Sequence, residues 1–84
     1  MNNKVLVNIY VPLLEKKYEV FLPANKKIGE IIILVGKALN EISGGYYQFK
    51  NTERLYNRIN GREYPINQLL KYTNIRNSTE LIFM

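Results

Sequence analysis

The spacing of apolar residues changes abruptly at Asn25, and this change limits the folds open to the chain. Before it, apolar and polar residues alternate over 4–11 and again over 17–22, a period of two that is typical of strands. After it, apolar residues recur at intervals of three and four over 26–42, which places them on one face of a helix. The pattern therefore predicts two neighbouring strands followed by one long helix.

Prolines and glycines mark where these elements are expected to end. Pro12 follows the first strand and Pro23 the second, because proline has no N–H to donate to a sheet. Asn25 is expected to cap the helix, and Gly44-Gly45 is expected to end it in a left-handed turn. The short loop between the two strands predicts that they pair as an antiparallel hairpin.

The second half of the chain contains shorter elements. Its pattern predicts strands at 54–57, 62–64 and 79–84, with a turn at Asn60-Gly61 and one helical turn within 66–73, and it gives no assignment for 46–53. A hairpin, a helix and further strands predict an α+β fold of the β-grasp type, in which the first and last strands are parallel neighbours. We expect one domain over 1–84, with a mixed sheet of four to five strands and the helix packed across one face.

The composition argues against catalysis. The 84 residues include no Cys, His, Trp or Asp, and all seven acidic residues are Glu. Thiolate nucleophiles, the commonest general base and the best ligands for transition metals are therefore missing. We expect no enzyme activity, no catalytic residue, no metal site and no cofactor.

No segment of the chain predicts a membrane span or a secretory signal. The longest apolar run is 31–35, which is too short to cross a bilayer. The N-terminal residues lack the apolar core of a signal peptide. We therefore expect a soluble cytoplasmic protein.

The chain resembles known proteins of the ubiquitin-like class. Residues 70–75 and 78–81 are similar to the last loop and last strand of ubiquitin. The segment Tyr18-Glu19-Val20-Phe21-Leu22, with the Pro23-Ala24 and Lys26-Lys27-Ile28 that follow it, resembles the small bacterial proteins of the YukD/EsaB type. Those proteins accompany type VII secretion systems in Gram-positive bacteria. The resemblance implies a non-catalytic accessory or regulatory protein of such a system.

The glycine pair lies in a different place from that of ubiquitin. Conjugation and sulfur transfer require a flexible tail that ends in Gly-Gly, whereas Gly44-Gly45 is internal and the sequence ends at Met84. YukD-type proteins likewise lack the tail. We therefore expect a domain that is not conjugated to other proteins.

The expected fold leaves one face of the sheet uncovered, and this face is our candidate partner-binding surface. Alternation along the strands assigns to it Leu6, Tyr10, Phe21, Ile82 and Met84. An apolar patch on a small domain commonly marks an interaction site. Its expected basic rim consists of Lys16, Lys17, Arg58 and Arg62. The alternatives are isolated exposed side chains without a function, or a patch covered by Tyr46, Tyr47 or Phe49.

The sequence is also compatible with other partners. The net charge of +5 makes a small nucleic-acid-binding protein the alternative function, although the charges are dispersed and no RNA-binding motif is present. Ile33 and Leu34 lie off the core face of the helix, and the 46–53 connection is expected to pack on them. A homodimer through an edge strand is also open.

Overall fold

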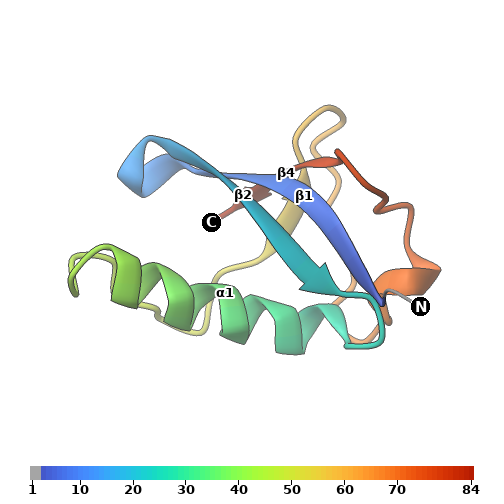
Figure 1. Ribbon diagram of the computed structural model, residues 1–84, viewed down its shortest axis with the longest axis horizontal. Helices are drawn as coiled ribbons and strands as arrows, with labels where there is room; N and C mark the ends of the chain where they lie inside the picture. Colours follow the sequence, from blue (N-terminus) through green and yellow to red (C-terminus); the bar gives the residue numbers. More distant parts are fainter. Residues whose placement is uncertain (1–2) are drawn as a thin grey trace.

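The computed structural model describes residues 3–84 and places one helix across one face of a four-stranded sheet (Figure 1). The strands are β1 (Lys4–Val11), β2 (Lys16–Pro23), β3 (Leu55–Asn57) and β4 (Glu80–Phe83), and the helix is α1 (Ile28–Ile42). Two short 3-10 helices, η1 (Pro12–Leu14) and η2 (Leu70–Tyr72), complete the elements. The strand order is β2-β1-β4-β3, with β1 antiparallel to β2 and parallel to β4, and β3 antiparallel to β4. The first and last strands are therefore parallel neighbours, which confirms the predicted β-grasp arrangement.

The helix begins later than predicted, and Asn25 is not its cap. Lys27 occupies the N-cap position, and its backbone N–H donates to the Glu30 carboxylate at 3.0 Å. The next two N–H groups, of Ile28 and Gly29, each donate to a backbone carbonyl in the 66–68 segment at 2.9 Å. These N–H groups have no partner within the helix, so the distant 66–68 segment supplies what a capping side chain would otherwise provide.

The predicted strand at 62–64 is wrong. Glu63 makes a single antiparallel bridge to Tyr56, and no ladder extends from it. The Asn57 side chain accepts hydrogen bonds from the N–H groups of Ile59 and Asn60, at 2.9 and 3.1 Å, and holds the turn that follows β3. Because β3 is only three residues long, it offers little edge for a further strand. The helical turn expected within 66–73 is confirmed in shorter form as η2.

The core lies between the sheet and α1, and it confirms the predicted orientation of the strands. Val7, Ile9 and Val11 are buried, and so are Leu22 of β2 and Leu81 of β4. The apolar face of α1 is buried along most of its length, but Ala38 and Ile42 at its C-terminal end are exposed. A groove lies between β2 and this end of the helix.

The connection between α1 and β3 packs on the helix and closes one end of the core. Tyr47 is buried, and its carbonyl accepts a hydrogen bond from the Asn40 side chain at 2.8 Å. The rings of Tyr47 and Phe49 lie 6.1 and 6.5 Å from the ring of Phe83. The expectation that this connection packs on Ile33 and Leu34 is therefore wrong, because both of those side chains are exposed.

Gly36 is the point at which this connection meets the helix. A Cβ atom added to Gly36 would lie within 2.8 Å of the Phe49 ring, which is closer than two carbon atoms can approach without a shift. We expect Gly36→Ala to lower the free energy of unfolding by about 1–3 kcal/mol, the usual cost of overpacking. Alanine's better helix propensity, about 1 kcal/mol, opposes this loss. Urea unfolding followed by circular dichroism measures the difference.

The control for Gly36→Ala is the same substitution made together with Phe49→Ala. Without the Phe49 ring, the added methyl group has room, and only the gain in helix propensity remains. Gly36→Ala should then be neutral or stabilising relative to Phe49→Ala alone. If Gly36→Ala raised the free energy of unfolding of the otherwise wild-type protein, the close contact between Gly36 and the Phe49 ring would be contradicted.

Candidate functional site

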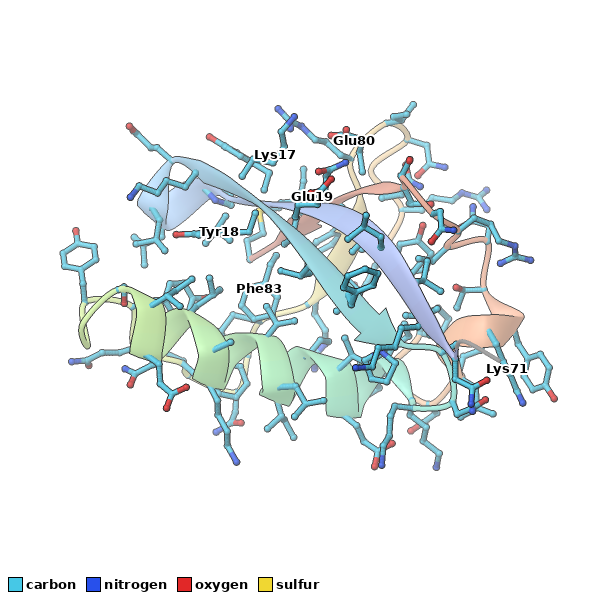
Figure 2. All side chains as sticks on the ribbon, in the orientation of Figure 1. Lys17, Tyr18, Glu19, Lys71, Glu80 and Phe83 are labelled. Carbon is cyan, nitrogen blue, oxygen red and sulfur yellow. The ribbon has the colours of Figure 1, made fainter. Side chains whose placement is uncertain are left out.

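The outer face of the sheet, meaning the face turned away from α1, is the candidate site. Figure 2 shows Lys17, Glu19 and Glu80 on this side of the sheet, whereas Tyr18 and Phe83 point between the sheet and the helix. The strand registers place the outer-face residues next to one another across the sheet. The set consists of Leu6, Asn8 and Tyr10 from β1, Lys17, Glu19 and Phe21 from β2, Tyr56 from β3, and Glu80 and Ile82 from β4.

Two apolar clusters lie at opposite ends of the outer face. Leu6 is directly opposite Phe21 in the β1–β2 ladder, and we call this pair the Leu6–Phe21 cluster. Phe21 is 59% exposed, although its side chain is a large apolar ring. At the other end, Ile82 lies between Tyr10 and Tyr56. The predicted residues Leu6, Phe21, Tyr10 and Ile82 are thus all on the outer face, in two pairs.

A row of polar residues separates the two clusters. Asn8 lies opposite Glu19 on one side and is in register with Glu80 on the other. The outer face is therefore not one continuous apolar patch. The alternation in β1 already contains the signal for this division, because Asn8 stands between the two outward apolar positions Leu6 and Tyr10.

Two of the four predicted rim residues converge on Glu80 within this polar row. Lys17 Nζ lies 4.0 Å from Glu80 Oε1, and Arg58 Nη1 lies 3.6 Å from the same oxygen. The Arg58 guanidinium also lies 4.7 Å from the centre of the Tyr10 ring, a cation–π geometry that partly covers the tyrosine. The outer face therefore has a charged centre with both signs rather than a purely basic rim.

The remaining predicted site residues lie away from this centre. Lys16 begins β2 opposite Val11, and Arg62 is exposed in the turn after β3. Met84 follows β4, donates its N–H to the Arg54 carbonyl at 3.2 Å, and lies by the hollow that Leu13 also lines. These three residues are not brought together with the Leu6–Phe21 cluster.

Glu53 is an organising residue that the sequence patterns did not single out. Glu53 is 6% exposed, and its carboxylate accepts hydrogen bonds from the Tyr47 hydroxyl at 2.9 Å and from the Thr52 N–H at 3.1 Å. The Lys50 N–H donates to the same carboxylate at 3.2 Å. Burial, followed by the hydrogen bond and charge of Glu53, raises the pKa of the Tyr47 phenol well above its ordinary value. The protonated phenol donates its hydrogen bond to Glu53, and the whole cluster stabilises the connection before β3.

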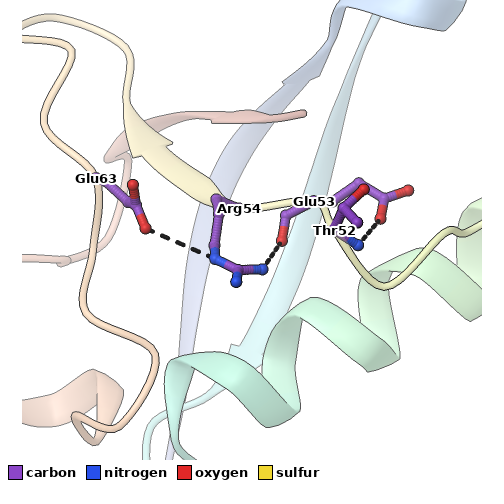
Figure 3. Close-up of polar contacts among 4 residues, drawn as sticks. All are labelled: Thr52, Glu53, Arg54 and Glu63. Carbon is purple, nitrogen blue, oxygen red and sulfur yellow. Dashed lines mark hydrogen bonds and ion pairs between the residues drawn. The ribbon is translucent and has the colours of Figure 1, made fainter.

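Arg54 extends this arrangement toward the turn after β3. Its Nη1 donates to the Glu53 carbonyl at 2.9 Å, and its Nε lies 3.7 Å from Glu63 Oε2 (Figure 3). These contacts tie the connection to the segment that bridges β3. The Glu53 carboxylate is hydrogen-bonded within the chain, and Glu53 is buried. We therefore assign it a structural role.

Residues 3–84 show neither a metal-binding cluster nor a membrane-spanning helix. No cluster of three or more side chains of the metal-binding types is present in that range. Nor does the described part of the chain contain a helix with the length and apolarity needed to cross a membrane.

Comparison with solved structures identifies the fold. The ubiquitin-like domain of EccD5 from Mycobacterium xenopi superposes with a TM-score of 0.79 at 17% identity, covering 99% of this chain and 94% of that one. The chain has the ubiquitin-like fold. No known protein-family model and no curated protein sequence matches it.

Further ubiquitin-like domains superpose over nearly the whole chain. The ubiquitin-like domain of the Mycobacterium tuberculosis type VII secretion system protein EccD1 gives a TM-score of 0.73 at 15% identity and covers 99% of this chain and 98% of that one. The N-terminal ubiquitin-like domain of the 4931431F19Rik protein gives 0.76 at 14% identity, covering 100% and 76%. At such identities the likeness establishes the ubiquitin-like fold alone.

Proposed function

We propose that the chain is a non-catalytic ubiquitin-like module that binds another protein through the outer face of its sheet. The observation that carries this proposal is the exposure of Phe21 beside Leu6 on a face that α1 does not cover. Burying an aromatic ring of this kind supplies much of the binding energy of a typical interface. The module acts by burial of this cluster against a complementary apolar surface of the partner.

The charged centre of the outer face would set the orientation of the partner. Lys17, Arg58 and Glu80 are all partly exposed, so their charges reach the surface of the module. Charges at the border of an interface contribute to association rate and to selectivity more than to affinity. A partner with an acidic group opposite Lys17 and Arg58 would be favoured over one with a basic group there.

We further propose that the partner is a component or regulator of a bacterial type VII secretion system, met in the cytoplasm. Two observations support this assignment. Residues 18–28 resemble the YukD/EsaB type, and ubiquitin-like domains of EccD5 and EccD1 superpose on almost the whole chain. The secretion assignment and the binding face are separate parts of the proposal and can fail separately.

We expect Phe21→Glu to abolish partner binding while it leaves the fold intact. An exposed side chain contributes little to folding, so the free energy of unfolding should change by no more than about 0.5 kcal/mol. Affinity capture from nuclease-treated lysate of the native organism, followed by mass spectrometry, measures binding. The wild type should retain a type VII secretion component that Phe21→Glu does not retain.

Ile59→Glu is the matched control for this experiment. Ile59 is 86% exposed in the turn after β3, so the same chemical change is made away from the outer face. Ile59→Glu should bind like the wild type. Equal retention by all three proteins would refute the assigned face. Retention of no protein, together with salt-sensitive binding to nucleic acid in untreated lysate, would favour the nucleic-acid alternative.

A further inference from the structure

β2 is a long edge strand with no pairing partner on its outer side among residues 3–84. The sheet order is β2-β1-β4-β3, so β2 and β3 each have a single strand neighbour. β3 has three residues and receives a further bridge from Glu63, whereas β2 has eight residues. An unpaired edge of this length is a template for another strand.

An apolar groove lies beside this edge, between β2 and the C-terminal half of α1. Its volume is about 240 Å³, and both elements line it. Tyr18 and Val20 contribute from β2, and the exposed side chains of Leu34 and Ile42 contribute from α1. A partner that paired with β2 through its backbone would also bury these side chains.

Alternate residues of β2 direct their backbone groups to the free edge. The Ala24 N–H donates to the Asn3 carbonyl at 2.7 Å. With the β1–β2 register, this bond shows which residues of β2 direct their backbone N–H and C=O groups toward β1 and which direct them away. Hydrogen-bonded and non-hydrogen-bonded pairs alternate along an antiparallel ladder. Lys17, Glu19 and Phe21 therefore present their N–H and C=O groups to the free edge.

The charges on these residues distinguish between the ways in which two copies of β2 can pair. A twofold axis places one residue of the strand opposite itself, and the choice of that residue sets the register. A register centred on Glu19 places the two Glu19 carboxylates opposite each other. A register centred on Val20 places Phe21 opposite Glu19 of the second copy. A register centred on Tyr18 places Lys17 opposite Glu19 of the second copy, twice by symmetry.

We propose that the chain forms a homodimer in which β2 pairs antiparallel with β2 of a second copy, centred on Tyr18. The two sheets become continuous, and opposite charges face each other on the outer face at both symmetry-related positions. On the inner side, the two Tyr18 side chains meet, and the two grooves face each other so that Leu34 and Ile42 are covered. This inference goes beyond the proposed function and does not depend on the identity of any other partner.

A charge exchange tests the proposed register. Sedimentation equilibrium from micromolar to millimolar concentration should show a monomer–dimer equilibrium for the wild type. Lys17→Glu alone and Glu19→Lys alone each create two like-charge pairs, so each should weaken dimerisation by roughly tenfold or more. The double variant Lys17→Glu/Glu19→Lys restores opposite charges and should dimerise like the wild type. A wild type that stays monomeric to millimolar concentration, or a double variant as weak as the single ones, would overturn the proposal.

A cysteine placed on the axis gives an independent test, because the chain contains no cysteine of its own. In the proposed register Tyr18 faces itself as a non-hydrogen-bonded pair, with Cα atoms about 4.5 Å apart. This separation is within the range of a disulfide, so Tyr18→Cys should cross-link under a mild oxidant at concentrations where the dimer forms. Val20→Cys should not cross-link, since Val20 faces Lys16 of the second copy. Efficient cross-linking of Val20→Cys instead would show the wrong register.

Discussion

Replacing Phe83 by alanine is expected to lower the free energy of unfolding by about 3–5 kcal/mol. The side chain is 1% exposed in β4, and its ring meets Tyr47 at 6.1 Å and Phe49 at 6.5 Å. Its removal leaves a cavity where the connection before β3 closes the core. A domain of 84 residues has a total stability of about 4–13 kcal/mol, so this loss is a large share of the total. Urea and thermal unfolding measure the change.

Met84→Ala is the control for the Phe83 substitution. Met84 is the next residue along the chain and is 60% exposed, so its truncation should cost no more than about 0.5 kcal/mol. Phe83→Leu should fall between the two, because leucine refills part of the volume. A loss of less than about 1 kcal/mol for Phe83→Ala would show that the connection does not pack on this ring as described.

Replacing Glu53 by alanine should lower the free energy of unfolding by about 3 kcal/mol. The substitution removes the acceptor of the Tyr47 hydroxyl and of the Lys50 and Thr52 N–H groups. A buried donor left without an acceptor costs about 1–3 kcal/mol, and only the more exposed donors can turn to water. The same unfolding measurements apply, and hydrogen exchange of the Lys50 and Thr52 amides should accelerate.

Two further variants distinguish the loss of the Glu53 hydrogen bonds from the loss of a carboxylate as such. Glu53→Gln keeps the size and one acceptor oxygen, but its NH₂ group faces donors, so it should lose less stability than Glu53→Ala. Glu63→Ala removes an exposed carboxylate that forms a 3.7 Å ion pair with Arg54, and it should cost no more than about 1 kcal/mol. Equal losses for Glu53→Ala and Glu63→Ala would contradict the structural role assigned to Glu53.

Phe83→Ala and Glu53→Ala both test the position of the 46–53 connection, and this position matters for the proposed binding face. The connection lies on the helix side, where Tyr47 and Phe49 complete the core against Phe83. It therefore leaves the outer face of the sheet free, and neither Tyr47 nor Phe49 covers the Leu6–Phe21 cluster. Core variants such as Phe83→Ala should weaken partner binding only to the extent that they unfold the domain.

Most of the fold could be predicted from the sequence because periodicity reports burial directly. The alternation over 4–11 and 17–22 and the helical spacing over 26–42 each require one side to be apolar. The structure turns that side toward the core and buries most of it, except Ala38 and Ile42 at the end of the helix. The boundaries were less accurate where the deciding contact is distant. Asn25 is a good cap by composition, but the 66–68 segment supplies the acceptors for the first turn and moves the start of α1 to Ile28.

The candidate site could be predicted only in part. Alternation correctly assigned Leu6, Tyr10, Phe21 and Ile82 to the outer face, because each strand has one buried side. It could not show that Asn8, Glu19 and Glu80 come together between them, because that row depends on the register of three strands. Nor could it place Lys17 and Arg58 on the same carboxylate, since they are 41 positions apart in the chain.

The sequence by itself determined the element order, the buried side of each strand and the absence of cysteine and histidine chemistry. These properties depend on residue type and on local spacing, which the chain carries before it folds. Only the tertiary structure decided the register that divides the outer face, the groove beside β2, and the contact of Phe49 with Gly36. Each of these brings together residues that are distant in the chain, and their positions follow from how the sheet and the helix pack as a whole.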